Sequence, residues 1–334
     1  QDAWISALIT PVVGLPFVWM YYYLGKLYPG KTLVEMICSA FGKWVGWIIS
    51  AAFVLFVCFL DASQVITYIG DFVKTEYMTE TPLYALNLLM VIGLAIGLLY
   101  GLEAISRSAE IFIYIATVIV VLSVLLNLPN IKFDNLLPVL ENGITPVLKG
   151  TLNLSSYMTW PLIVINMVYP ANCDNTNKSR NSLFFGYVFG AGVNFICTIM
   201  SILVLGSTIT ARSQYPTYLL AKEIDISSIT RIEGVVALAW ILTEFVKTLL
   251  YFYAGAVGIS QLFKLKDYKK VVLPLSLILL VFSGVVYPDF AYQTKWDSTT
   301  WIPFIGSFGA FLPILLIIVS IIKINSKYIK NLEN

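Results

Sequence analysis

The strongest constraint on this chain is the recurrence of apolar runs of about 20 residues, the length that an α-helix needs to cross a bilayer. The 334 residues are 58% hydrophobic and only 12% charged, a balance that soluble domains of this size do not reach. The sequence therefore predicts an all-α polytopic membrane protein with nine spanning helices in this chain. They are expected at about 4–24, 44–66, 82–101, 108–128, 144–169, 183–207, 231–262, 269–288 and 300–323.

The basic residues indicate how these helices are oriented. Thirteen of the 21 Lys and Arg residues lie in loops on the side that the chain reaches after its first run, and six lie on the opposite side. Because basic loops stay in the cytoplasm, the C-terminus is expected there, and nine spans then place Gln1 outside. Two polar segments, 25–43 and 208–230, are expected to be loops with short surface helices.

The start of the chain suggests one more helix. Residues 1–3 carry no basic or signal-like segment and lead directly into the first apolar run. We therefore expect a further helix to precede Gln1, which gives ten helices and places both termini in the cytoplasm. Ten helices suit two inverted five-helix repeats. The first repeat would cover 1–143, without its first helix, and the second would cover 144–334.

The run 144–169 is poorly suited to being one continuous helix. Ser155, Ser156 and Tyr157 lie in its middle, and it also contains helix-weakening residues and a charge: Pro146, Lys149, Gly150 and Pro161. In hydrocarbon, a broken helix survives only against protein or a watery cavity, and its exposed ends then bind small charged ligands. The alternative is a kinked helix whose own Ser and Thr side chains bond the freed backbone groups.

A second polar group falls within the predicted helix 44–66 and just beyond it. Asp61, Gln64 and Tyr68 are spaced three and four residues apart, so they share one helical face, and Ser63 and Thr67 lie among them. Charges inside spans are expensive and mark functional candidates. This face is predicted to line a ligand cavity, unless the helix ends near Leu60 and these residues reach the membrane interface.

The predicted helix 231–262 carries a third polar group. Glu244 and Lys247 are three residues apart on one face, which also holds Thr248. Such a pair neutralises itself in a membrane, or Lys247 replaces a coupling cation, or the pair opens when a ligand or proton arrives. In the last two cases, ligand hydrogen bonds are expected from Thr243, Thr248 and Tyr251.

Several functions are disfavoured by composition. The chain has no histidine, which removes Ser-His-Asp and Cys-His catalysis and histidine metal sites. Its net charge of +2 is too small to indicate nucleic-acid binding. The four cysteines show no paired spacing and are interpreted as small apolar residues. We therefore expect neither an enzyme nor a metal or cofactor site.

Two stretches resemble a known family. They are QDAWISALI at 1–9 and a set of residues between the expected seventh and eighth helices: Tyr215-Pro216, Arg231-Ile-Glu233, Trp240 and Phe245-x-Lys247. Together with the broken helix, they resemble the spore germination permeases, which are the B subunits of nutrient germinant receptors. The resemblance implies a LeuT-like fold of the amino acid–polyamine–organocation superfamily and a location in the inner spore membrane. It also implies A and C partner subunits and a small nutrient ligand.

The resemblance also implies where the ligand would bind. In this fold the site lies between the breaks of the first and sixth helices and is walled by the third and eighth, and the first helix would precede Gln1. The implied site residues are Asp61, Ser63 and Gln64; Ser155, Ser156, Tyr157 and Thr159; and Thr243, Thr248 and Tyr251. The charges of Asp61, Glu244 and Lys247 favour a zwitterion such as an amino acid. The alternatives are an H⁺- or Na⁺-coupled amino acid transporter, a membrane enzyme and a structural membrane partner.

Overall fold

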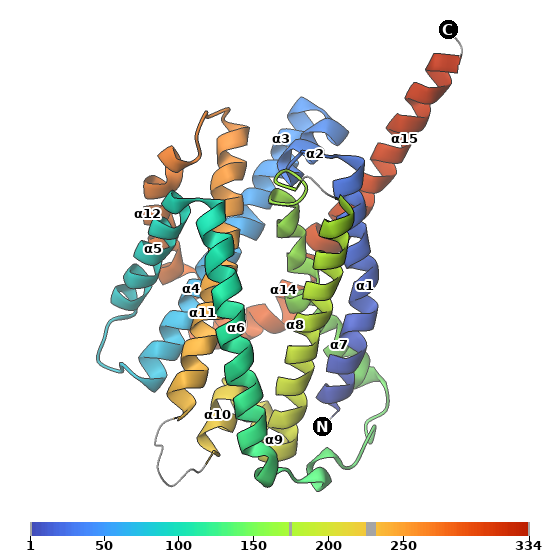
Figure 1. Cartoon of the computed structure of the whole chain (residues 1–334). Coiled ribbons are helices and arrows are strands. Elements are labelled where there is room, and N and C mark those ends of the chain that lie inside the picture. The colour runs from blue at the N-terminus through green and yellow to red at the C-terminus, as the bar shows by residue number, and fades with distance from the viewer. Residues whose placement is uncertain (1, 174–175, 225–231, 333–334) are drawn as a thin grey trace.

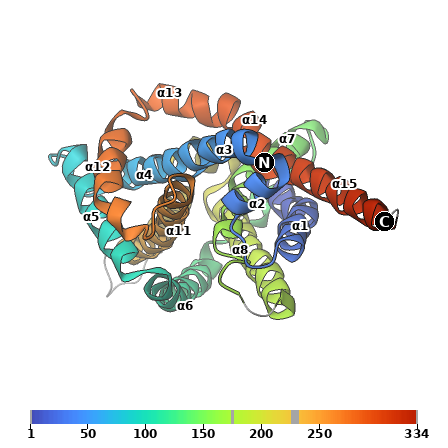
Figure 2. The same cartoon turned by 90° about the horizontal axis from the view of Figure 1, so that it is seen from above.

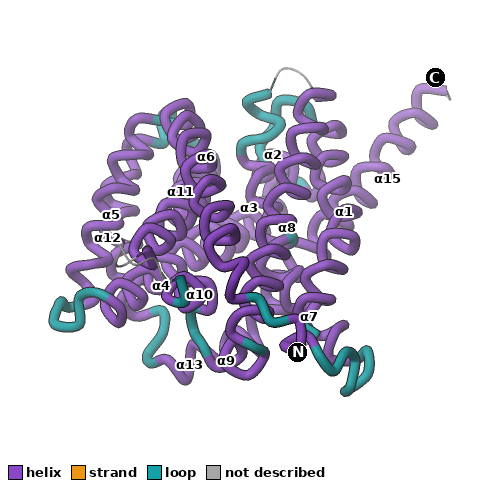
Figure 3. The backbone as a smooth tube through the Cα atoms, turned by 60° about the horizontal axis from the view of Figure 1, so that its bottom comes forward, coloured by secondary structure: helices purple, strands orange, loops and turns teal. Residues whose placement is uncertain are grey.

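The computed structural model describes residues 2–173, 176–224 and 232–332, and within these ranges every regular element is a helix. Seven helices in the described chain are long and apolar enough to span a membrane. They are Ala3–Leu27, Lys43–Glu76, Leu83–Tyr100, Leu102–Asn130, Ser179–Leu205, Ile232–Leu262 and Phe290–Lys323. The prediction of an all-α polytopic membrane protein is confirmed. Figure 3 shows helices over nearly all of the chain, with the longer loops at the ends of the bundle.

The remaining two predicted spans take different forms. Residues 269–288 begin as α12 (Lys269–Val285), a helix of 17 residues. Residues 144–169 form two shorter pieces, α7 (Thr145–Met158) and the 3₁₀ helix η4 (Trp160–Met167). The predicted break therefore lies at Thr159. Pro161 accounts for it, because its ring nitrogen cannot donate to the carbonyl of Tyr157 and disfavours helical geometry in the preceding residue.

The helices form two groups when the bundle is seen from above (Figure 2). α5 (Leu83–Tyr100), α6 (Leu102–Asn127), α11 (Ile232–Leu262) and α12 pack together on one side, and α1 (Ala3–Leu27), α7 and α8 (Thr176–Leu205) pack together on the other. The long helix formed by α3 (Lys43–Ala52), the π-helical turn η1 (Phe53–Phe59) and α4 (Leu60–Glu76) packs against α11 and approaches η4. In Figure 1 the two chain ends lie at opposite ends of the bundle. The division into inverted repeats, 1–143 and 144–334, stays a prediction.

One expectation about the connecting segments is wrong. The segment 25–43 does contain a short helix, α2 (Leu33–Phe41), but this helix is not on the surface. Thr32 and Glu35 form a capping box that starts it, and its apolar face, including Met36 and Ile37, is fully buried. The amphipathic pattern of α2 therefore serves packing against η4, α11 and α15 (Leu312–Leu332). The segment 208–230 contains two short helices, α9 (Ser207–Arg212) and α10 (Pro216–Lys222).

The C-terminal span is irregular as well. Its pieces are α13 (Phe290–Lys295), the π-helical turn η5 (Trp296–Thr300), α14 (Trp301–Gly306), a second π-helical turn η6 (Ser307–Phe311) and α15. At Gly309 this span meets the start of η4 so closely that a β-carbon at Gly309 would overlap the backbone of Trp160. Two irregular helices therefore touch backbone to backbone, and only glycine permits that approach.

The hydroxyl of Tyr21 from α1 lies at this contact and is fully buried. It donates to the carbonyl oxygen of Gly309 at 2.7 Å and lies within 3.3 Å and 3.5 Å of the carbonyl oxygens of Trp160 and Thr159. A single hydroxyl thus supplies the donor that two broken helices lack. In hydrocarbon such freed carbonyls must be bonded within the protein.

Tyr21→Phe is expected to lower the free energy of unfolding by about 1 kcal/mol, because it leaves these carbonyls without a donor while the ring volume is kept. Thermal unfolding in detergent measures the change. Tyr100→Phe is the matched control, since Tyr100 is an exposed tyrosine without a hydrogen bond to the described residues. Equal stability of the two variants would contradict the role of Tyr21.

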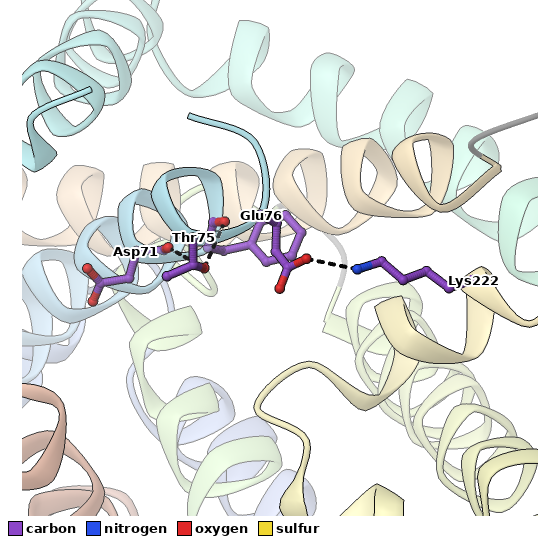
Figure 4. A network of polar contacts seen from close by, with 5 residues as sticks. Asp71, Thr75, Glu76 and Lys222 are labelled. Atoms are coloured by element: carbon purple, nitrogen blue, oxygen red, sulfur yellow. Dashed lines mark hydrogen bonds and ion pairs between the residues drawn. The ribbon is translucent and has the colours of Figure 1, made fainter. Parts of the chain in front are cut away.

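The end of α4 opposite α3 is covered by α10. Phe72 of α4 is almost fully buried in an aromatic cluster, with the rings of Tyr215, Tyr218 and Trp240 at 4.8–5.2 Å. Figure 4 shows the polar contacts next to this cluster: Thr75 bonds back to its own helix, and Glu76 pairs with Lys222 of α10 at 3.0 Å. Both charged side chains of this pair are partly exposed. The cluster, and not the ion pair, therefore holds α10 in place.

Phe72→Ala is expected to cost about 3–5 kcal/mol of stability, because it empties a fully packed site. Lys222→Gln is expected to cost less than about 1 kcal/mol, the usual limit for a partly exposed ion pair. Thermal unfolding of the two variants ranks the two contributions. A larger loss in Lys222→Gln would show that the ion pair is the main attachment of α10.

Candidate functional site

A small cavity lies where α4, the α7–η4 break, α11 and α14 meet. Its volume is about 30 Å³, which leaves room for one or two water molecules. Five of the predicted site residues line it: Asp61, Gln64, Tyr157, Lys247 and Tyr251. They share the lining with Val65, Tyr68, Pro161 and Trp301.

Irregular backbone places these side chains around the cavity. The π-helical turn η1 ends at Phe59, two residues before Asp61, and therefore sets the direction in which the polar face of α4 points. The break at Thr159 lies between Tyr157 and Pro161 and sets the positions of both. π-Helical turns and broken helices are frequent at functional sites because they redirect side chains and free backbone groups.

Asp61 is the most unusual residue of the cavity. Its side chain is 3% exposed, and neither carboxylate oxygen has a hydrogen-bond partner among the described residues. The amide nitrogen of Gln64, one turn further along α4, is also buried without a described partner. Burial of a lone carboxylate costs several kcal/mol unless an opposite charge or donors compensate. The cavity therefore presents an acceptor that is free to bind a cationic or donating group.

Lys247 brings a cation to the same cavity. Its ammonium nitrogen lies 3.2 Å from Glu244 Oε2, so the predicted charge pair is formed. The side chains of Lys247 and Glu244 are 43% and 23% exposed, which shows that the pair is not sealed in the protein interior. Lys247 therefore presents a cation to the cavity while it is paired with Glu244.

A hydrogen-bonded network closes one side of the cavity. Tyr68 donates to Asp297 Oδ1 at 2.8 Å, and its hydroxyl lies 2.9 Å from that of Tyr287. Burial raises the pKa of Tyr287, which lies in the loop between α12 and α13, so this hydroxyl stays protonated at neutral pH. Tyr157 stacks on Trp301, with ring centroids 5.4 Å apart. These contacts fix two walls of the cavity.

The sequence analysis missed Asp297, Trp301 and Tyr287. Tyr287 lies near the end of the span expected at 269–288, whereas the structure ends α12 at Val285 and places Tyr287 in the loop after it. Asp297 lies within the π-helical turn η5, and Trp301 begins α14. A charge next to a long apolar run was a usable signal, but the last span was expected to begin at 300, whereas it begins at Phe290.

The structure does not bring the other predicted site residues into the cavity. Ser63, Ser156, Thr243 and Thr248 bond to backbone carbonyls of their own helices at 2.6–2.8 Å. Thr159 bonds to the hydroxyl of Tyr187 at 2.9 Å, on the side of the break that faces α8 and α1. Ser155 is buried, and its hydroxyl has no partner in the described part of the chain. The helical spacing predicted on which face of its helix each residue lies. It did not show that most of these hydroxyls bond to backbone carbonyls of their own helices.

Metal binding finds no support in this arrangement. No cluster of three His, Cys, Asp or Glu residues that would hold a metal ion occurs within 2–173, 176–224 and 232–332. The four cysteines are free thiols. The site is therefore an arrangement of opposite charges, hydroxyls and aromatic rings around a small cavity.

The sequence profile of the family described as spore germination protein matches residues 1–290. The chain belongs to the spore germination protein family. It is 26% identical to spore germination protein KB of Bacillus subtilis (strain 168) over 97% of this chain and 87% of that protein. It is also 29% identical to spore germination protein YndE of the same organism, over 96% of this chain and 87% of that protein.

A more distant relative extends the range of organisms. The chain is 20% identical to spore germination protein XB of Bacillus anthracis, over 96% of this chain and 88% of that protein. Family membership and the long apolar helices together identify an integral membrane protein with a role in germination. The family is not a known class of enzymes.

The two carboxylates near the cavity are expected to respond oppositely to amidation. Asp61→Asn should raise the free energy of unfolding by about 1 kcal/mol or more, because it removes an uncompensated buried charge. Asp297→Asn should lower it by about 1 kcal/mol, because it weakens the bond from Tyr68. Thermal unfolding at neutral pH without added ligand measures both changes. A loss of stability in Asp61→Asn as large as that in Asp297→Asn would show that Asp61 has a structural partner.

Proposed function

We propose that this chain is the ligand-sensing membrane subunit of a nutrient germinant receptor, and that its central cavity binds a small zwitterion such as an amino acid. The observation that supports this proposal most is the buried carboxylate of Asp61, which lacks a described partner and lines the same cavity as Lys247. One acceptor and one cation with a water-sized space between them are complementary to a ligand that carries an ammonium and a carboxylate.

In this mechanism the ammonium of the ligand binds Asp61, and the carboxylate of the ligand attracts Lys247. Glu244 then loses its partner, or shares it, and the face of α11 that carries the pair is rearranged. The gain in binding free energy is largest at Asp61, because a buried charge is compensated there at low effective dielectric. The hydroxyl of Tyr251 and the amide of Gln64 are polar groups that remain available around the ligand.

The small volume of the cavity implies that binding requires a change of conformation. A space of about 30 Å³ is far too small for an amino acid. One wall is the stacked pair of Tyr157 and Trp301, and the hydroxyl of Tyr157 lies 3.5 Å from the backbone carbonyl of Asp297. The adjacent break at Thr159 is a ready hinge. Ligand binding would then favour an open or rearranged state by its higher affinity for that state.

The setting of this proposal follows from the family resemblance and the charge pattern. We propose that the chain lies in the inner spore membrane with its C-terminus in the cytoplasm. It would work together with A and C receptor subunits, to which the rearrangement is passed. The inverted five-helix repeats would supply the two halves that move against each other. A coupled amino acid transporter would use the same cavity, and it differs in whether the ligand crosses the membrane.

Thermal shifts against a panel of free amino acids, sugars and nucleosides test the proposal. An amino acid should stabilise the wild-type protein, by about 2.7 kcal/mol at a hundredfold excess over its Kd. The shift should be lost in Asp61→Asn and reduced at least tenfold in apparent affinity in Lys247→Gln. Ser63→Ala and Thr243→Ala are the matched controls, because both hydroxyls bond within their own helices.

Two outcomes would change the assignment. A shift that survives in Asp61→Asn but is lost in Thr243→Ala would place the ligand elsewhere. Ligand uptake by proteoliposomes that contain this chain alone would favour the transporter. Absence of uptake, together with loss of germination in spores that carry Asp61→Asn, would favour the sensor.

A further inference from the structure

A second hollow lies between α1 and α8, far larger than the central cavity. These helices pack along each other, and the C-terminal end of α1 lies next to the beginning of α8 at one end of the bundle (Figure 1). The hollow has a volume of about 510 Å³. Its lining is aromatic, amide and basic: Trp19, Tyr22, Tyr23, Lys26, Arg180, Asn181 and Phe184. We refer to it as the α1–α8 cleft.

The cleft carries two cations and no acidic side chain. Lys26 and Arg180 are both exposed, and neither forms an ion pair with a carboxylate among the described residues. Among the described residues, the guanidinium of Arg180 donates a hydrogen bond only to the side-chain oxygen of the neighbouring Asn181, at 3.3 Å. Two unpaired cations that face one hollow from different helices are complementary to a phosphate group.

The position of the cleft relative to the membrane narrows the class of ligand. Lys26 is one residue from the end of the span Ala3–Leu27, and Arg180 is the second residue of the span Ser179–Leu205. Both cations therefore lie at the same membrane–water boundary. Trp19 is 52% exposed and stacks on Tyr23, with ring centroids 5.1 Å apart. It precedes Lys26 by seven residues of α1 and therefore lies about 10 Å deeper, at the level of the acyl chains.

The inner wall of the cleft is rigid. Tyr22 stacks on Tyr169, with ring centroids 6.3 Å apart, and the hydroxyl of Tyr169 lies 3.5 Å from the backbone carbonyl of Tyr22. Gly25 makes room for Tyr169, because a β-carbon there would overlap its ring. A preformed aromatic wall beside two cations lowers the cost of ordering a ligand on binding.

We propose that the α1–α8 cleft binds one anionic phospholipid, with the headgroup phosphate between Lys26 and Arg180 and the acyl chains along Trp19 and Phe184. A phospholipid is favoured over a free phosphate ion because the apolar part of the lining would stay wet around an ion but is covered by a lipid. The bound lipid joins α1 to α8. Tyr187 of α8 is hydrogen-bonded to Thr159 at the helix break. Because the lipid holds α8 against α1, its binding also stabilises this break.

Native mass spectrometry of the detergent-purified full chain tests the proposal, with phosphatidylglycerol and phosphatidylcholine as probes. One phosphatidylglycerol should be retained much more strongly than phosphatidylcholine. Each cation beside an anionic headgroup is expected to contribute roughly a factor of five, so Lys26→Gln/Arg180→Gln should weaken retention about thirtyfold. Lys26→Arg/Arg180→Lys should keep it, which separates lost charge from misfolding.

The matched control is Lys43→Gln/Lys270→Gln, which removes two exposed basic residues at the beginnings of α3 and α12. This control should retain phosphatidylglycerol as the wild type does. Equal loss in both double variants, or equal retention of the two lipids by the wild type, would overturn the proposal. Displacement of the lipid by millimolar inorganic phosphate would also overturn it, because the cleft would then be a site for a free anion.

Discussion

The architecture depends on how this chain bonds the backbone groups that its irregular helices leave free. Three carbonyls from two broken spans lie around the hydroxyl of Tyr21, and Gly309 allows those spans to touch. In water these carbonyls would be solvated, but in a bilayer they need a donor from the protein. The break that shapes the central cavity is therefore held by a side chain from another helix, about 140 residues earlier in the sequence.

This dependence explains what sequence reasoning predicted and what it missed. Apolar run length predicted the helices well, since the cost of exposing a backbone to hydrocarbon leaves few alternatives. Pro161 located the break because proline acts locally. The donor at the break was not predictable, because Tyr21 is one of three consecutive tyrosines and only packing decides which of them points inward. The same limit applies to Ser63 and Thr248, whose bonds to their own helices leave no trace in the helical spacing.

The polar residues of the membrane region fall into two kinds. Most of them, such as Thr159 with Tyr187, are bonded and contribute to packing. Asp61 is different, because its carboxylate is buried in a cavity that lacks a described partner for it. A protein that keeps an uncompensated charge in its interior gives up stability for it, and such a loss is characteristic of binding sites. Lys247, which is paired with Glu244, lines the same cavity and suits the same interpretation.

The π-helical turn η1 has a further consequence. A π-helical turn is what remains when one residue is inserted into a regular α-helix. The wider turn takes up that extra residue, so if the same residues Phe53–Phe59 wound as regular α-helix, everything after them would rotate by about 100°, the step between successive α-helical residues. Asp61, Gln64 and Tyr68 would then leave the cavity together without any change of residue. In this helix, the hydrogen-bond pattern of one turn therefore decides as much about the site as the identity of its side chains does.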